Sequence, residues 1–257
     1  MKVFETIGAF QEWRRSIPLN QTVGFVPTMG ALHLGHESLM QEARKKNDLV
    51  VLSIFVNPTQ FNQKEDFEKY PKTWEQDLEI AKRAGVDAIF APKDGQAMYP
   101  DEYRYKISES TFSKELCGEF RPGHFDGMLT VVFKLFQITK PTRAYFGEKD
   151  HQQLSLVQGM IEALFLDVEL VPCKTFREAS GLALSSRNLR LSVAEKEIAP
   201  RLYETMTKVP DLIEAKSKLT ALGFKVEYLI DRPEANGKRR YAAAWLGDVR
   251  LIDNVKF

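Results

Sequence analysis

Apolar positions along the first 175 residues follow two different patterns. Short, continuously apolar runs bounded by polar or turn residues predict buried strands at residues 22–28, 48–56, 87–91, 143–146 and 167–171. Between them, apolar residues that recur every three or four positions predict amphipathic helices at residues 37–46, 77–85 and 152–165. This strand–helix alternation is typical of an α/β fold, a parallel sheet with helices on both faces.

The pattern of residues 129–139 (LTVVFKLFQIT) does not distinguish a strand from a buried helix, because they are apolar throughout and rich in β-branched side chains. Their length slightly favours a helix over a strand. After about residue 175 the pattern changes. Two amphipathic helices are predicted at residues 192–209 and 211–223, and strands of a small antiparallel sheet at residues 224–231, 241–246 and 249–253. We therefore predict two domains, residues 1–175 and a smaller α+β domain of residues 176–257.

Composition narrows the class of protein. The chain has 257 residues, 44% hydrophobic and 28% charged, as in ordinary soluble proteins. A formal net charge of +1 gives no bulk field for a nucleic acid or an anionic membrane, so we expect neither as a partner. Cys117 and Cys173 lie in no CxxC or Cys/His cluster, which disfavours a disulfide scaffold and a structural zinc site. Without a signal peptide or an apolar run long enough to span a membrane, the simplest expectation is a cytoplasmic protein.

The first candidate site is PTMGALHLGH, residues 27–36, which follows the first strong strand. Gly30 and Gly35 allow the backbone to turn and to approach a ligand closely. His33 and His36 lie three residues apart where a helix begins, so both rings can face the same side. The N-terminus of that helix favours a phosphate, to whose oxygens the histidines can donate. The alternative, that the histidines only cap a turn, is disfavoured by the position of the motif between a strand and a helix.

A second motif, SIFVNPTQF at residues 53–61, presents Gln60 after a strand that Asn57 and Pro58 end. A glutamine is both donor and acceptor, so it can bind a hydroxyl and a carboxylate together. By itself this motif is typical of a turn rather than of a site.

A third motif, FGEKDHQQ at residues 146–153, also follows a predicted strand. Gly147 permits close approach, Lys149 can neutralise phosphate charge, and Asp150 can hold Mg²⁺. Gln153 is a candidate counterpart of Gln60 across a pocket. In isolation this motif could be an ordinary polar turn.

A fourth motif, GLALSSRN at residues 181–188, combines two serine hydroxyls with Arg187 at the predicted domain boundary. Such a loop can close over a triphosphate, with Arg187 offsetting developing charge. The alternative is a serine-rich linker. In RPGHFDG, residues 121–127, we interpret His124 as structural rather than as a ligand contact.

In this order and spacing, PTMGALHLGH, SIFVNPTQF, CGEFRPGHFDG, FGEKDHQQL and LALSSRN resemble the pantothenate synthetase family. The resemblance runs from about residue 22 to residue 190, with a weaker similarity in the C-terminal WLGDVRLIDN. It implies a Rossmann-like nucleotidylyl-transferase domain of the HIGH superfamily, a smaller C-terminal lid domain and a homodimer. The implied reaction joins pantoate to β-alanine through a pantoyl-adenylate, with ATP and Mg²⁺, and releases AMP and pyrophosphate.

The resemblance also implies roles for individual residues. His36 corresponds to a proton donor and His33 to a group that stabilises the phosphates, with Lys149 and Arg187 as further catalytic residues. Gln60 and Gln153 correspond to pantoate-binding glutamines, and Gln60 should also contact β-alanine. Asp150 is the implied metal ligand. The residues expected to contact ATP are Met29, Gly30, Ala31, Leu32, His33, Leu34, Gly35, His36, Gly147, Glu148, Lys149, Asp150, Phe176, Leu184, Ser185, Ser186 and Arg187.

Three features depart from the family pattern. The sequence REASG at residues 177–181 replaces the usual proline or alanine followed by aspartate and glycine. Leu184 stands where methionine is usual, a change that conserves volume. The segment after residue 190 is shorter than in many relatives.

The sequence disfavours three other functions. A HIGH-type adenylyl transferase acting on a phosphorylated pantetheine or a nicotinate nucleotide would need basic residues where Gln60 and Gln153 stand. An aminoacyl-tRNA synthetase would need a basic anticodon-binding module, which the sequence lacks. A non-catalytic nucleotide-binding protein is disfavoured because both histidines, Lys149 and Arg187 are all present.

Overall fold

A computed structural model describes all 257 residues, and the chain divides into two compact units. The first unit consists of Met1–Gly147 and Gln152–Cys173, and the second of Glu148–His151 and Lys174–Phe257. The four residues that follow Gly147 therefore pack with the C-terminal part of the chain, although they are far from it in sequence. None of the helices combines the length and the apolar character needed to cross a membrane.

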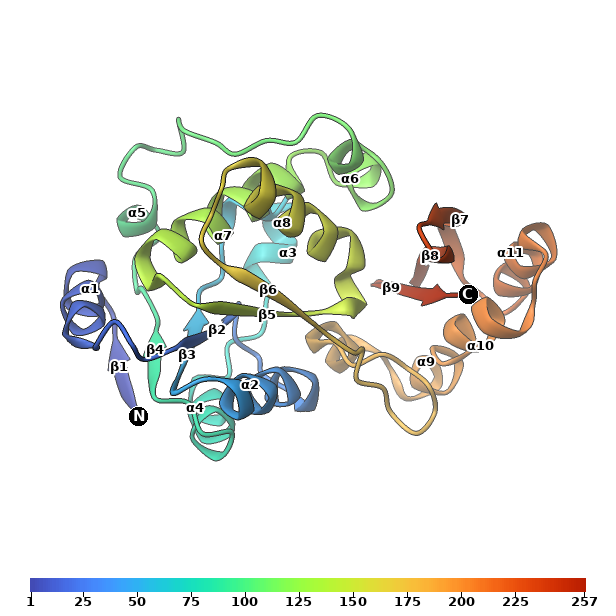
Figure 1. Cartoon of the computed structure of the whole chain (residues 1–257). Helices are drawn as coiled ribbons and strands as arrows, with labels where there is room; N and C mark the ends of the chain where they lie inside the picture. Colours follow the sequence, from blue (N-terminus) through green and yellow to red (C-terminus); the bar gives the residue numbers. More distant parts are fainter. The chain divides into compact units, whose positions relative to one another are not determined.

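Six parallel strands form the sheet of the first unit, in the order β1-β4-β3-β2-β5-β6 (Figure 1). The strands are β1 (Lys2–Phe4), β2 (Val23–Thr28), β3 (Leu49–Ile54), β4 (Ala88–Phe90), β5 (Arg143–Gly147) and β6 (Glu169–Cys173). The strand order reverses at β2, which lies between β3 and β5. Ligands in such sheets bind beyond the carboxyl ends of the strands at this reversal, so the loop after β2 is in a suitable place to bind a ligand.

Helices cover both faces of this sheet, α2 and α4 on one and α7 and α8 on the other (Figure 1). Val26 of β2 packs with Met40 of α2, whereas the ring of its neighbour Phe25 lies 6.3 Å from that of Phe136 in α7. The predicted parallel sheet with helices on both faces is therefore confirmed. The helices are α1 (Ile7–Ser16), α2 (Leu34–Lys46), α3 (Lys64–Glu68), α4 (Trp74–Arg83), α5 (Gly95–Met98), α6 (Cys117–Phe120), α7 (His124–Thr139) and α8 (His151–Ala163). Single 3₁₀ turns are η1 (Pro58–Gln60), η2 (Phe112–Lys114) and η3 (Glu148–Asp150).

The second unit is an antiparallel sheet covered by short helices. Its elements are η4 (Ser186–Arg190), α9 (Val193–Ile198), α10 (Arg201–Lys208), α11 (Leu212–Ala221), β7 (Lys225–Glu234), β8 (Gly237–Leu246) and β9 (Val249–Lys256). One core cluster joins Met206 of α10 and Leu219 of α11 to Leu229 and Ala244 of the sheet. The predicted antiparallel sheet is confirmed. The single helix predicted at residues 192–209 is wrong, because the chain breaks between α9 and α10 at Pro200.

The imidazole of His151 is enclosed within the second unit. Its Nδ1 lies 2.8 Å from the Tyr241 hydroxyl, and its Nε2 lies 3.9 Å from a carboxylate oxygen of Glu234. Burial, with a smaller contribution from Arg239, lowers the pKa of His151 from 6.5 to about 4.

We expect the second unit to become less stable as the pH falls from about 7 to about 5. In the unfolded chain His151 takes up a proton near its ordinary pKa, whereas in the folded chain it stays neutral until about pH 4. The unfolded state therefore binds more protons in this window, and the difference amounts to about 2 kcal/mol at pH 5. Urea unfolding of the wild type and of His151→Gln at both pH values should give a smaller pH dependence in the variant. Equal pH dependence would contradict this assignment.

Candidate active site

The loop after β2 places two histidines at the start of α2. His33 is the N-cap residue, and its Nδ1 accepts from the backbone N–H of Gly35 at 3.1 Å. His36 reaches back, and its Nδ1 accepts from the backbone N–H of His33 at 3.4 Å. The ring centroids are 4.1 Å apart, so the two rings lie together as the spacing predicts.

This reciprocal capping determines which nitrogen of each ring is a donor. A neutral imidazole that accepts through Nδ1 carries its proton on Nε2. Both His33 and His36 can therefore donate through Nε2. The N-terminus of α2 adds the positive end of the helix dipole, which favours an anion such as a phosphate.

A buried carboxylate from α4 fixes the same loop. Asp77, which is 2% exposed, accepts from the backbone N–H of Ala31 at 3.1 Å and of Leu32 at 2.8 Å. The Thr73 hydroxyl donates to the same carboxylate at 3.0 Å. Ala31 has a φ of 51°, a left-handed conformation that is unfavourable for a residue with a Cβ atom. Asp77 thus holds a strained backbone two residues before His33, a role that was not predicted from the sequence.

Gln60 reaches from η1 towards the loop after β2. Its Nε2 donates to the Met29 sulfur at 3.1 Å, and its Oε1 accepts from Asn57 Nδ2 at 3.0 Å. The Tyr99 hydroxyl donates to Asn57 Oδ1 at 2.7 Å. Burial raises the pKa of Tyr99 to about 12, so this hydroxyl remains a donor. The chain Tyr99–Asn57–Gln60 therefore fixes which end of the Gln60 amide faces Met29, a role the sequence did not reveal for Asn57 or Tyr99.

The main chain of Gln60 is held by α7. Nδ1 of His124 lies 2.8 Å from the Gln60 carbonyl oxygen, and Nε2 of the same ring lies 3.0 Å from Nη1 of Arg121. A Cβ atom at Gly127 would lie 2.2 Å from the Thr59 carbonyl oxygen, so only glycine lets α7 approach η1 this closely. His124 has the structural role predicted from the sequence.

Gln153 lies in the first turn of α8 and is half-buried. Its side chain makes no hydrogen bond to Gln60. The preceding residue, Gln152, accepts from the backbone N–H of Cys117 at 3.1 Å and donates to the carbonyl oxygens of Phe112 and Glu115. Gln152 is therefore structural, and the pairing of Gln153 with Gln60 around one substrate stays a prediction.

The third motif forms η3, directly after Gly147 at the end of β5. Lys149 Nζ lies 3.7 Å from Asp150 Oδ2, and the Asp150 side chain is 47% exposed. No group of three or more His, Cys, Asp and Glu side chains is placed to hold a metal ion. A single half-exposed carboxylate suits Mg²⁺ that arrives with nucleotide phosphates and keeps several of its waters, rather than a metal held by protein alone.

The fourth motif is a folded turn and not an extended linker. Ser185 caps η4, because its hydroxyl accepts from the backbone N–H of Arg187 at 3.3 Å. Asn188 Nδ2 donates to the Ala183 carbonyl oxygen at 3.0 Å. Ser185, Ser186 and Arg187 are thus gathered within one turn. Phe176, which precedes this segment, is 42% exposed.

A family model described as pantoate-beta-alanine ligase matches residues 2–256. The chain belongs to this family. A pantothenate synthetase from Bdellovibrio bacteriovorus is 58% identical over 255 residues, covering 99% of each chain. One from Coxiella burnetii is 50% identical, covering 100% of this chain and 97% of the relative. The predicted membership of the pantoate–β-alanine ligases is confirmed.

Solved structures of this ligase family agree with the fold over the whole chain. The ligase from Francisella tularensis, described as complexed with beta-gamma ATP and beta-alanine, has a TM-score of 0.93 at 42% identity. It matches over 100% of this chain and 97% of its own. The pantothenate synthetase from Thermus thermophilus has a TM-score of 0.91 at 40% identity, over 100% of this chain and 99% of its own. The predicted combination of a parallel sheet and a small C-terminal sheet is that of the family.

Proposed function

We propose that this chain condenses pantoate with β-alanine, using ATP, to give pantothenate, AMP and pyrophosphate. The observation that carries the proposal is the pair of capped histidines at the start of α2, in a chain of the pantoate–β-alanine ligase family. The Gln60 amide held against Met29 adds a donor and an acceptor for a hydroxy acid beside this loop. The description of the Francisella tularensis ligase supports ATP and β-alanine as ligands.

In the first step, a carboxylate oxygen of pantoate attacks the α-phosphorus of ATP. The bond from this phosphorus to the oxygen that bridges to the β-phosphate breaks, and pyrophosphate leaves with the bonding electrons. His36, in the role of proton donor, donates a hydrogen bond through Nε2 and His33 stabilises the phosphates, while Lys149 and Arg187 offset the negative charge that develops. Mg²⁺, with Asp150 as its protein ligand, supplies further neutralisation of phosphate charge when bound.

In the second step, the amine of β-alanine attacks the acyl carbon of the pantoyl-adenylate. The bond from this carbon to the AMP oxygen breaks, AMP leaves with the bonding electrons, and the amine loses a proton to solvent as the amide forms. Gln60 and Gln153 bind pantoate, and Gln60 also contacts β-alanine. No covalent bond to the enzyme is required, so catalysis depends on positioning and charge stabilisation.

The remaining assignments rest on the family resemblance. We propose a HIGH-type ATP site, a lid role for the C-terminal domain, a homodimer and a cytoplasmic location. Both cysteines are buried and neither is in a disulfide, which fits a reducing compartment. The proposed ATP contacts are Met29, Gly30, Ala31, Leu32, His33, Leu34, Gly35, His36, Gly147, Glu148, Lys149, Asp150, Phe176, Leu184, Ser185, Ser186 and Arg187. Sedimentation velocity of the purified chain would test the dimer.

The direct test mixes the protein with MgATP and pantoate, with and without β-alanine, and follows AMP, pyrophosphate and pantothenate. We expect pantoate-dependent pyrophosphate release without β-alanine, and pantothenate with AMP only when β-alanine is added. Absence of pyrophosphate release with pantoate would show that the substrate or the activity is wrong. Other acceptors of the adenylyl group would then be screened.

Replacing Asp77 with asparagine is expected to lower turnover about tenfold or more while the chain stays folded. The amide nitrogen of asparagine cannot accept, so one buried N–H of Ala31 or Leu32 loses its partner at a cost of about 1–3 kcal/mol. The histidine pair then shifts, and a displacement of about 1 Å can cost about 10²-fold in rate. The measurement is steady-state pantothenate formation, with Glu75→Gln on the exposed face of α4 as control. Equal rates for the two variants would exclude a positioning role for Asp77.

A further inference from the structure

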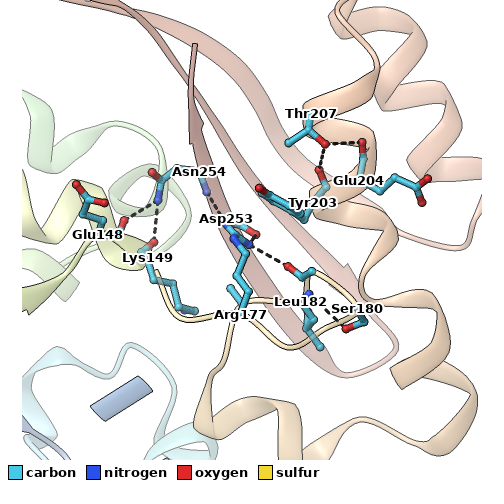
Figure 2. A network of polar contacts seen from close by, with 12 residues as sticks. Glu148, Lys149, Arg177, Ser180, Leu182, Tyr203, Glu204, Thr207, Asp253 and Asn254 are labelled. Carbon is cyan, nitrogen blue, oxygen red and sulfur yellow. Dashed lines mark hydrogen bonds and ion pairs between the residues drawn. The ribbon is translucent and has the colours of Figure 1, made fainter. Parts of the chain in front are cut away.

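Two adjacent residues of β9, Asp253 and Asn254, each hold one loop of the second unit that carries proposed ATP contacts (Figure 2). Asn254 contacts η3, and Asp253 contacts Arg177, which precedes the Ser185 turn and is not itself a proposed ATP contact. Asp253 and Asn254 are buried, at 5% and 6% exposed. They lie in the C-terminal stretch WLGDVRLIDN, which has no role in the proposed reaction. Successive side chains of a strand point to opposite sides, so one strand can hold two different segments.

Asn254 holds the main chain of η3. Its Nδ2 donates to the carbonyl oxygen of Glu148 at 2.8 Å and to that of Lys149 at 3.0 Å. Its Oδ1 accepts from Arg239 at 2.7 Å, which fixes the orientation of the amide. Asn254 therefore fixes the backbone that carries the Lys149 side chain (Figure 2).

Asp253 holds the base of the turn that leads to Ser185. Its two carboxylate oxygens accept from the guanidinium of Arg177 at 2.6 and 2.8 Å. The same guanidinium stacks 3.7 Å above the centre of the Tyr203 ring and donates to the Gly181 carbonyl oxygen. Arg177 pairs with Ala183 in an isolated antiparallel bridge across this turn, so the anchored bridge lies two residues before Ser185.

The altered sequence REASG does not disturb this anchor. Ala179 and Ser180 are exposed at the tip of the turn, away from the carboxylate of Asp253. Arg177, at the base of the turn, makes the ion pair. The altered residues therefore lie outside the ion pair that anchors the turn.

We propose that Asp253 and Asn254 are positioning residues for adenylation, which hold Lys149 and the Ser185–Ser186–Arg187 turn in fixed register to one another. The link is direct, because Asp253 Oδ1 also accepts from the backbone N–H of Asn254 at 2.8 Å. This inference rests on the proposed function, since it assigns to both segments a contact with ATP. Neither residue needs to touch the substrate.

The main test is Asn254→Asp, which keeps the size of the side chain but turns an oxygen towards two carbonyl oxygens. We expect pantoate-dependent pyrophosphate release to slow about 10- to 100-fold, because small displacements of catalytic groups have effects of this size. The KM for pantoate should not change, since Gln60 and Gln153 belong to the first unit. Asn236→Asp, the same change at an exposed turn of the same sheet, is the control and should behave as wild type. Wild-type pyrophosphate release by Asn254→Asp would overturn the proposal.

A double-variant cycle separates positioning from a general structural effect. If Asn254 acts through Lys149, Asn254→Asp should add no further loss in a Lys149→Ala background. Asp253→Asn should likewise add no further loss in an Arg187→Ala background. Penalties of Asn254→Asp that multiply with Lys149→Ala would overturn the proposal.

Calorimetric binding of MgATP makes the test independent of turnover. We expect weaker binding by Asn254→Asp than by wild type and Asn236→Asp. A wild-type chain that binds MgATP but forms no pantothenate would refute the proposed function alone, and the affinities would still decide the role of Asn254. A wild-type chain that binds no MgATP would refute both.

Discussion

Replacing His36 with alanine is expected to slow pantothenate formation by at least about 10²-fold, and up to about 10³-fold, while the chain stays folded. The variant loses the Nε2–H donor that remains when Nδ1 of His36 accepts the capping hydrogen bond. It also loses the acceptor for the backbone N–H of His33, 3.4 Å away, and so loosens the second ring of the pair. Pyrophosphate release in a single turnover with MgATP and pantoate measures the affected step directly.

Two further variants separate the donor from the cap. Asparagine at position 36 places an acceptor near the position of Nδ1 but has no counterpart of Nε2, so His36→Asn should be nearly as slow as His36→Ala. Gln41→Ala, on an exposed position of the same helix, should keep wild-type turnover. Full activity in His36→Asn would show that capping of α2, and not proton donation, is the function of this residue.

The histidine pair could be predicted because all of its geometry is local. His33, Gly35 and His36 lie within one helical turn, so spacing and the start of the helix determine how the rings meet. The same holds for Ser185 and Arg187 in η4, where a serine caps its own turn. The structure of such a motif is determined by residues that lie within a few positions of one another.

The residues that hold these motifs were not predicted, because their partners are distant in sequence. Asp77 contacts Leu32 across 45 positions, Tyr99 contacts Asn57 across 42, and Asn254 contacts Lys149 across 105. A buried aspartate or asparagine on a helix or strand has no local pattern that distinguishes it from an exposed one. Only the fold brings the carboxylate or amide to the backbone groups that it holds.

Some helices and strands could likewise be predicted from local sequence, and others could not. The strands β2 and β3 were predicted to within two residues at either end, because buried central strands are continuously apolar. The segment at residues 129–139 gave no period because α7 is buried on nearly all sides, which removes the polar face. The three-residue edge strand β1 was missed, since its place depends on pairing with β4.

Replacing Arg240 with methionine is expected to lower the free energy of unfolding of the second unit by about 3–5 kcal/mol. Arg240 is 1% exposed, and its guanidinium donates to Asp231 at 2.7 and 3.1 Å. It also donates to the carbonyl oxygens of Met206, Val209 and Pro210, which lie at the end of α10 and just beyond it. Methionine fills the space but leaves these buried acceptors without donors. The hydrogen bonds from Arg240 also lower the pKa of Asp231 below its ordinary value. In the variant these hydrogen bonds are absent, so the pKa of Asp231 should rise towards its ordinary value.

Urea unfolding followed by circular dichroism measures this loss. Arg240→Lys should recover only part of it, because an ammonium is a point charge and cannot reproduce the planar fork that serves one carboxylate and three carbonyl oxygens. Arg201→Met is the matched control, since Arg201 is an exposed residue of α10 whose ion pair with Glu204 is a surface pair worth about 0–1 kcal/mol. If Arg240→Met were as stable as Arg201→Met, the buried guanidinium would not be what joins α10 to the sheet. The sheet that carries Asp253 and Asn254 would then owe its placement to the apolar core cluster that includes Met206 and Leu219.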